Sequence, residues 1–380
     1  MQRFYFVILV AIVALYGSAR AFATHPEAYY PDAPSAHAPG HTADYATGYA
    51  SVPHIGLLLP LQSASFGPAA ETVKEGFVAA AGRESALPLA VRVYSTTDDP
   101  LDVLVTYHQA LQAGAVLIVG PLTRNGVTAV ASSHTIAVPT LALNSTDTSM
   151  PLPPNLFLFG MQMEAEASHI AGLALDSNDM LRKHAIIIKD AGGLSSRLQS
   201  AFASRWLNEF GNTAESVEYE DDQGFFSQLR RHTSGAENVV FLALDANKVR
   251  RVRAFLSPEV PVYATSQVFV SNADPLYFNE LDGIRFMDMP WLLQPDHPAV
   301  MAYRGLHQGK DKDTERLFAL GIDAFRLMSR LLYARSPDEV ALDGVTGYIR
   351  YAPPAQFIRE PVAARFDKGG VQILSVPAIR

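Results

Sequence analysis

The chain has 380 residues, of which 48% are hydrophobic and 18% are charged, and its formal net charge is −8. This length has room for two domains that each bury a core, and the composition is globular rather than fibrous or disordered. The acidic balance excludes a general nucleic-acid binder, which needs a basic face to displace counterions from phosphates. The chain also lacks an arginine-rich run, so we expect no nucleic-acid partner.

The first 23 residues are typical of an export signal. Arg3 precedes a compact apolar stretch from Phe4 to Tyr16, and two small-x-small cleavage patterns follow it. The stretch is shorter than the roughly 20 residues that span a bilayer, and Arg20 interrupts it. We therefore predict a cleavable signal peptide over residues 1–23 and a periplasmic location. A retained signal segment is the alternative.

Residues 24–52 repeat Pro, Ala, His, Gly and Tyr without Lys or Arg, which predicts a disordered linker. His37 and His41 are four residues apart, but Pro39 between them argues against the helix that a metal site would need. The chain contains no Cys. Core packing alone must therefore hold the fold, and we expect no covalent lipid anchor, no metal and no cofactor.

Globular sequence begins at His54 with alternating strand and helix patterns. Apolar runs typical of buried strands alternate with helical patterns that place apolar residues on one face. The expected strands are 55–61, 89–94, 115–119 and 138–143, with helices between the first three. This rhythm predicts a doubly wound, mostly parallel sheet with right-handed crossovers.

A second unit with the same rhythm begins near Glu164. Its expected strands are 184–189, 238–244 and 261–264, and its helices run through 198–210 and 249–256. The helix Leu317–Tyr333 carries a long apolar stripe and should return to the first unit. We therefore predict a two-lobed α/β fold with hinge crossovers and a cleft. Lobe 1 comprises 53–163 plus 267–340, and lobe 2 comprises 164–266 plus 341–380.

Several segments have an unusually specific amino-acid sequence. A strand reading PVYATS (261–266) precedes LDGIRF (281–286) and PWLL (290–293), and LFALGIDAFR (317–326), GVTG (344–347) and Ile358-Arg359 follow. Together they closely resemble the C-terminal domain of LpoA-type penicillin-binding-protein activators, the LppC family. The match is densest over 184–372, and the likeness to type I periplasmic binding proteins covers roughly 54–372.

That resemblance implies a fold and a function. The fold is that of a type I periplasmic binding protein, and the function is non-catalytic activation of a class A penicillin-binding protein, a peptidoglycan synthase, by protein contact. The chain departs from the family pattern because it has no Cys to carry a lipid. The long helical-repeat domain that precedes this module in full-length family members is also not recognisable here.

The cleft of the type I fold suggests a second function. Amino-acid-binding members hold the ligand carboxylate on two first-lobe loops and the ammonium on a second-lobe charge. The corresponding residues here, our ligand-cleft candidates, are Thr123, Arg124, Asn144, Ser145, Thr146, Ser266 and Gln267. Arg124 replaces an expected small Ser, and Ser266 or Gln267 replaces the expected acid, which weakens an amino-acid site.

The alternative is thus a periplasmic solute-binding receptor, a component of an amino-acid-type transporter, for a small polar or anionic ligand. Arg124 either grips an anionic group or points into solvent. Residues 144–146 either line the cleft or cap helices, since such side chains satisfy free N–H groups at helix starts.

Catalytic patterns are absent. The sequence has no Ser-x-x-Lys, Gly-x-Ser-x-Gly or His-Glu-x-x-His, and its Asp-Asp pairs are typical of solvated turns. We therefore do not expect an enzyme.

Two features suggest contact with a protein partner. Trp291 follows a proline at a strand end, and Trp is enriched at interface hot spots; alternatively it packs on the hinge. Arg250, Arg251 and Arg253 form a basic concentration in an acidic protein, which would steer an acidic partner; alternatively they are a solvated helix surface.

Overall fold

The computed structural model describes residues 52–84, 88–133, 136–148, 150–176, 184–271, 276–307, 309 and 311–375. The predicted signal peptide and all but the last residue of the predicted linker lie outside these ranges. Residues from Ala50 onward form one compact unit. None of the helices in the described ranges has the length and apolar composition that a membrane span requires.

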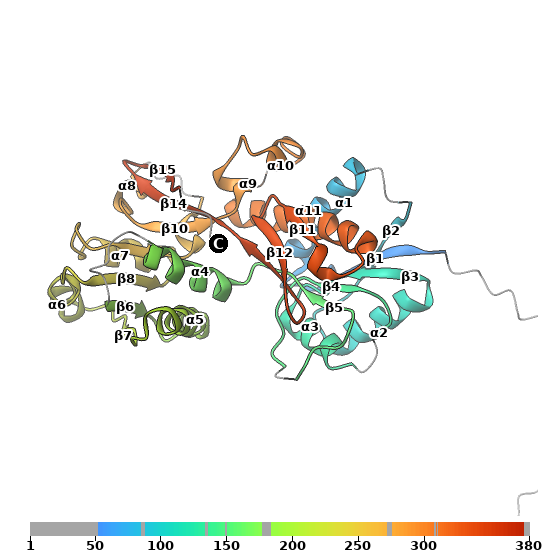
Figure 1. Cartoon of the computed structure of the whole chain (residues 1–380), viewed down its shortest axis with the longest axis horizontal. Coiled ribbons are helices and arrows are strands. Elements are labelled where there is room, and N and C mark those ends of the chain that lie inside the picture. The colour runs from blue at the N-terminus through green and yellow to red at the C-terminus, as the bar shows by residue number, and fades with distance from the viewer. Residues whose placement is uncertain are drawn as a thin grey trace, which may run out of the picture. The chain divides into compact units, whose positions relative to one another are not determined.

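The first lobe is built on a sheet with eight described strands (Figure 1). The six strands from β13 to the edge strand β2 run parallel, while β12 and β11 add an antiparallel edge. In pairing order the strands are β11 (Ala341–Asp343), β12 (Tyr348–Ala352), β13 (Gln356–Glu360), β5 (Leu156–Leu158), β4 (Thr140–Ala142), β3 (Ala115–Val119), β1 (His54–Leu59) and β2 (Ala90–Ser95).

Helices cover both faces of this sheet. One core layer contains apolar residues of α1 and α11, and the opposite layer contains those of α2 and α3. Short segments link the sheet to α11. The helices are α1 (Gly67–Arg83), α2 (Pro100–Gln112), α3 (Arg124–Ala131), α9 (Pro290–Leu293), α10 (Pro298–Met301), α11 (Lys312–Tyr333) and the 3₁₀ turn η2 (Pro337–Glu339).

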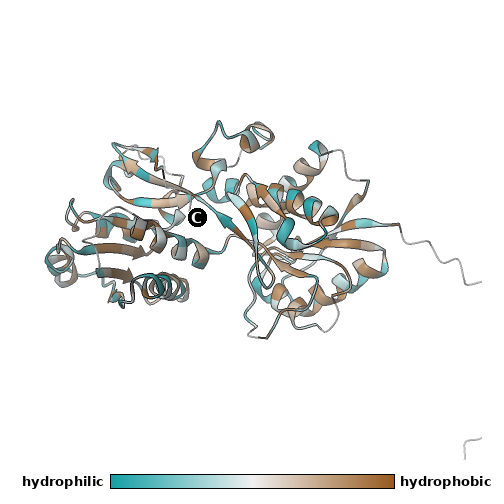
Figure 2. Ribbon diagram, viewed as in Figure 1, coloured by the Kyte–Doolittle hydropathy of each residue, from teal (hydrophilic) through white to brown (hydrophobic). Residues whose placement is uncertain are grey.

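The second lobe repeats the plan with seven described strands. Its central strands are parallel, and β14 and β15 form an antiparallel edge. In pairing order they are β15 (Gly370–Ile373), β14 (Val362–Asp367), β10 (Arg285–Asp288), β9 (Val262–Ala264), β8 (Asn238–Ala243), β6 (His184–Lys189) and β7 (Glu215–Glu218). Figure 2 shows β6 and β8 in hydrophobic colours, as expected for strands buried on both faces.

This sheet also has helices on both faces. Apolar residues of α4 and α5 form one core layer, and those of α6, α7 and α8 contribute to the other. The elements are α4 (Met163–Asp176), α5 (Gly193–Phe210), α6 (Gln223–Thr233), α7 (Ala246–Arg253), the 3₁₀ turn η1 (Ser266–Val268) and α8 (Tyr277–Glu280). The predicted fold class, two lobes that each hold a mostly parallel sheet, is confirmed.

The predicted lobe boundaries are wrong in two places. Strand β10 lies in the second sheet, between β9 and β14, although residues from 267 onward were assigned to the first lobe. Strands β11, β12 and β13 lie in the first sheet, although residues from 341 onward were assigned to the second. In Figure 1 the red C-terminal strands accordingly appear in both sheets. The chain changes lobe after β5, after β10 and after β13.

The physical reason lies in how short these strands are. β10 has only four residues and is recognisable as part of the second sheet only through its partners β9 and β14. Between β13 and β14 a single proline, Pro361, separates strands of different sheets. The local sequence pattern does not show that β13 and β14 are separate strands in different sheets.

Two glycines allow α1 and α11 to cross in close contact. A Cβ at Gly76 would collide with the backbone carbonyl of Phe318, and one at Gly321 would collide with that of Val73. Each helix therefore approaches the other through a position without a side chain. This crossing forms much of the first-lobe core.

We predict that Gly76→Ala destabilises the protein by about 1–3 kcal/mol, because the added methyl group forces the two helix backbones apart. Gly82→Ala, in the same helix, is the matched control. Its Cβ would meet no atom within 4 Å, so it should be neutral or stabilising by about 0.5–1 kcal/mol. Urea unfolding of the three proteins measures both effects, and equal stabilities for the two variants would contradict the prediction.

Candidate functional site

Arg316 joins the two lobes. It lies on α11 in the first lobe and is only 6% exposed. Its guanidinium makes a two-pronged ion pair with Asp288 of β10, Nε to Oδ1 at 3.1 Å and Nη2 to Oδ2 at 2.6 Å. The same Nη2 donates to the carbonyls of Ser266, at 3.1 Å, and Phe269, at 2.9 Å. All these acceptors belong to the second lobe, so one buried side chain fixes α11 to that lobe.

The carboxylate of Glu166 completes the second-lobe side of this network. Glu166 lies on α4 and accepts hydrogen bonds from the backbone N–H of Ser266 and from its hydroxyl, the latter at 3.0 Å. Burial raises the pKa of Glu166 to about 7, with the nearby Asp288 acting in the same direction, while Arg359 and the bonds from Ser266 oppose the shift. Glu166 therefore changes its charge near neutral pH.

Arg359 is the second cation of this network, at the end of β13. Its Nε donates to the carbonyl of Gly160 at 3.4 Å, and one Nη donates to that of Thr346 at 3.5 Å. Burial lowers the pKa of Arg359, and the Glu166 and Asp288 charges oppose that shift. Two long hydrogen bonds leave most of its five N–H donors unused by the described residues.

Asp323 connects two of the segments singled out in the sequence. It lies on α11 with no exposed surface. It accepts the backbone N–H groups of Val345 and Thr346, at 3.1 and 2.7 Å, and the Thr346 hydroxyl at 2.7 Å. The segments LFALGIDAFR and GVTG thus meet through this carboxylate, which holds the turn between β11 and β12.

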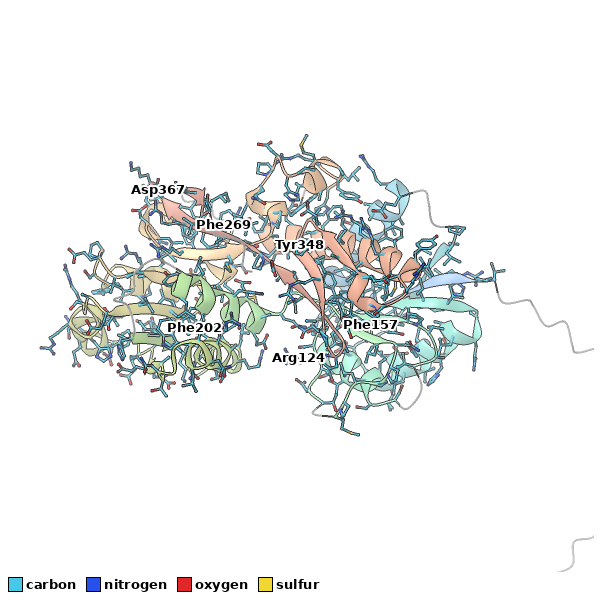
Figure 3. All side chains as sticks on the ribbon, viewed as in Figure 1. Arg124, Phe157, Phe202, Phe269, Tyr348 and Asp367 are labelled. Atoms are coloured by element: carbon cyan, nitrogen blue, oxygen red, sulfur yellow. The ribbon has the colours of Figure 1, made fainter. Side chains whose placement is uncertain are left out.

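A second, more exposed contact also joins the lobes. Arg124 begins α3 in the first lobe, and Figure 3 shows it on the side of that lobe that faces the second. Its guanidinium bonds Asp147 at 3.0 Å and reaches Glu164 of α4 at 3.2 Å. Arg197 of α5 binds the same Glu164 oxygen at 2.7 Å. One second-lobe carboxylate therefore lies between arginines of both lobes.

A pocket of about 460 Å³ adjoins the buried network. It lies where β5, β8, β9, β10 and β13 end, which is the carboxyl edge at which open α/β sheets bind ligands. Its lining residues come from both lobes and from the crossovers. They are Met161, Met163, Glu166, Asp245, Ala246, Asn247, Ser266, Gln267, Val270, Asp288, Met289, Asp313, Arg316 and Arg359.

The structure does not bring the seven ligand-cleft candidates together. Only Ser266 and Gln267 line this pocket. The first-lobe candidates serve local structure: Thr123 caps α3 through the N–H of Gly126, and the amide of Asn144 donates to the carbonyl of Leu122 at 2.9 Å.

The remaining first-lobe candidates are similarly placed. The hydroxyl of Thr146 contacts that of Thr128 at 3.3 Å, and the buried Ser145 hydroxyl has no partner among the described residues. Arg124 does grip an anionic group, but the group belongs to the protein itself. Binding of a ligand by these residues stays a prediction.

The partner-contact candidates all contact the protein's own residues. Trp291 is half-buried; its indole N–H donates to Glu315 at 2.6 Å and its ring packs on Phe318. The three arginines of α7 pair with second-lobe groups: Arg250 with Glu280, Arg251 with Asp221, and Arg253 with the carbonyl of Asp282. Contact with a partner stays a prediction for these four residues.

Sequence reasoning missed the four charged residues that form the network, namely Glu166, Asp288, Arg316 and Arg359. Arg359 lies inside a segment that the resemblance had singled out, and Asp288 lies between two of them, but no local pattern marks a charge as buried. One feature of the sequence points to Arg316, because this residue lies on a helix just before an apolar stripe.

The fold and the pocket between the lobes define the class of this protein: it has the two-lobed architecture of type I periplasmic binding proteins. One solved structure with this architecture, described as a "putative branched-chain amino acid ABC transporter from Chromobacterium violaceum", is 36% identical. It superposes with a TM-score of 0.70, covering 83% of this chain and 99% of that one.

Within that class, the family is shown by the sequence. The family model described as "LppC putative lipoprotein" matches residues 23–231 and 226–369, and the chain belongs to this family. Penicillin-binding protein activator LpoA of Pantoea ananatis is 26% identical over 337 residues. The resemblance inferred from the sequence segments is thereby confirmed.

A solved structure of the LpoA C-domain from Haemophilus influenzae, described as a regulator of PBP1A, shares the fold. Its TM-score is 0.72 at 24% identity, covering 85% of this chain and 100% of that one. The chain spans about half the length of the curated relatives, 48% in the case of the Pantoea protein.

We predict that Arg316→Met destabilises the protein by about 3–5 kcal/mol, because it leaves the Asp288 carboxylate buried without its counter-ion. The double variant Arg316→Met/Asp288→Leu should recover much of that loss, since it removes both charges. Arg330→Met, at an exposed position of the same helix, is the control. Chemical denaturation gives the unfolding free energy of wild type and the three variants. An Arg316→Met protein as stable as Arg330→Met would refute the assigned role of Arg316.

A second prediction concerns pH. Because the pKa of Glu166 rises from 4.5 to about 7 on folding, the native state holds a proton in this window that the unfolded state has lost. The contribution of Glu166 to wild-type stability should therefore fall as the pH rises from 4.5 to about 7. Glu166→Gln lacks this contribution and keeps an acceptor for the Ser266 N–H, so its stability relative to wild type should increase over the window, by up to about 3 kcal/mol.

The measurement is the unfolding free energy of both proteins at several pH values between 4 and 8. Glu220→Gln, at an exposed position, controls for the loss of one negative charge. A difference between Glu166→Gln and wild type that stays constant with pH would show that Glu166 does not titrate in this window.

Proposed function

We propose that this protein is a non-catalytic activator of a class A penicillin-binding protein, acting in the periplasm. Membership of the LppC family supports this, as does the fold shared with a domain described as a regulator of PBP1A. The match covers 100% of that domain and 85% of this chain. The proposed partner is therefore the peptidoglycan synthase itself.

The observation that carries the proposal is that the chain's own side chains join the lobes. Arg316 and Asp288 form a buried bridge, and Glu164 pairs with an arginine of each lobe. In a transport receptor the ligand bridges the lobes, whereas here ion pairs between the chain's own side chains bridge them. A fixed two-lobed surface suits docking to another protein with little change of shape.

Activation then follows from differential binding. A regulator that binds the active conformation of a synthase better than the resting one shifts the population toward the active state. No group of the regulator has to take part in bond making. The size of the activation is limited by the ratio of the two affinities.

The rival function is a solute receptor, and the 36% identity to a protein described as a putative branched-chain amino acid transporter component favours it. Two of the predicted cleft hydroxyls, those of Thr123 and Thr146, nevertheless contact other first-lobe groups here, and Arg124 is occupied by Asp147 and Glu164. These contacts argue against an amino-acid site of the usual kind.

The test uses the full chain and the class A synthase of the same organism. We expect glycan polymerisation and peptide cross-linking to increase with added protein and to saturate, because a specific complex has a limited number of sites. The control is an unrelated acidic protein of similar size. In parallel, thermal unfolding with leucine, isoleucine or valine examines the rival function. No stimulation and no binding, together with stabilisation by one of these amino acids, would overturn the proposal in favour of a receptor.

A further inference from the structure

Apolar, charged and amide side chains line the pocket between the lobes. Its volume of about 460 Å³ falls within the roughly 300–1,000 Å³ typical of small-molecule sites. Met161, Met163, Val270 and Met289 supply apolar surface. Charged and amide side chains supply the rest. Such a mixture suits a ligand with an apolar body and a few polar groups.

Arg359 is the cation of this pocket whose donors are least used. Its recorded bonds are the two long contacts to carbonyl oxygens, and it makes no ion pair with a described residue. By contrast, every guanidinium nitrogen of Arg316 is already bonded, to Asp288, Asp313 and two carbonyls. A partly buried guanidinium without a bonded carboxylate is a ready site for an anion, and its planar fork matches a carboxylate.

Two amide side chains also line the pocket with unused groups. Gln267 accepts one bond, from the hydroxyl of Thr265 at 3.4 Å, and its NH₂ group donates to no described residue. The side chain of Asn247 makes no hydrogen bond to a described residue. Together they offer the donors and acceptors that a peptide backbone requires.

The rim has the opposite charge. Asp245 and Asp313 line the pocket with half or more of their side chains exposed, 50% and 84%. Counting Glu166 and Asp288 as ionised, the lining holds four acids against Arg316 and Arg359, and Lys248 beside the pocket pairs with Asp245 at 3.1 Å, so one net negative charge remains. A ligand that also carries a positive group therefore fits this electrostatic field better than a simple anion.

From these observations we propose that the pocket binds a short peptide whose C-terminal carboxylate pairs with Arg359. The peptide amides bond Gln267 and Asn247. Its side chains pack on Met161, Met163 and Met289, and its ammonium group faces Asp245 and Asp313. This site overlaps the predicted cleft only at Ser266 and Gln267, because the five first-lobe candidates do not line it. Since Arg316 already joins the lobes, the peptide enters a preformed pocket. The inference goes beyond activation of a synthase and does not depend on it.

The test compares two probes, the tripeptide alanyl-leucyl-alanine with a free C-terminus and the same tripeptide as its C-terminal amide. Calorimetry and thermal unfolding use the full chain without any synthase, so failure here leaves the activation assay untouched. We expect the free acid to bind and to raise the melting temperature, and the amide to bind at least about tenfold more weakly, because only a carboxylate pairs with the guanidinium.

Variants then locate the site. Arg359→Met should weaken binding of the free acid at least about tenfold, and Arg359→Lys should weaken it less, because it keeps the charge but not the fork. Gln267→Leu, outside the charged network, gives an independent test if Arg359→Met folds poorly, and should also weaken binding. Arg330→Met is the control and should bind as wild type does.

Three results would overturn the proposal. The first is no binding of the free acid by wild type up to about 1 mM. The second is equal binding of acid and amide. The third is unchanged affinity in folded Arg359→Met or, where that variant does not fold, in both Arg359→Lys and Gln267→Leu.

Discussion

The arrangement of the two lobes depends on one buried cation. Arg316 is carried by the long helix of the first lobe, but its acceptors are a carboxylate and two carbonyls of the second. A buried guanidinium has a large desolvation cost, and only complete hydrogen bonding offsets it. Separating the lobes would expose all these hydrogen-bonding groups to solvent or leave them without partners at the same time. The network is therefore better understood as a device that specifies one geometry than as a simple source of stability.

The same principle explains why the distinctive sequence segments are spread along the chain. Ser266 and Arg359 come from two of them, Asp288 lies between two others, and Arg316 directly precedes another. They meet because the chain changes lobe three times and each crossover brings a strand end to the same place. Asp323 repeats this pattern within the first lobe, where it binds the turn before β12. Residues that look unrelated in sequence are thus parts of one polar network.

The sequence predicted the α/β class, the long apolar helix and the strand that ends at Ala264, because each depends on local periodicity. It did not predict that β10 belongs to the second sheet or that β11 to β13 return to the first, since those assignments depend on pairing partners far away in sequence. It also placed Arg124 in a ligand cleft. Only three-dimensional proximity reveals that Asp147 and Glu164 already neutralise it.

The crossovers also govern how the molecule can be assembled. Neither lobe is encoded by a continuous stretch, because the first sheet needs β11 to β13 and the second needs β14 and β15. An emerging chain that stops before residue 341 can complete neither core, and its sheets keep open edges. Contacts between distant segments form slowly, because long loops must close first. The two cores can therefore be completed only when nearly all of the chain is available.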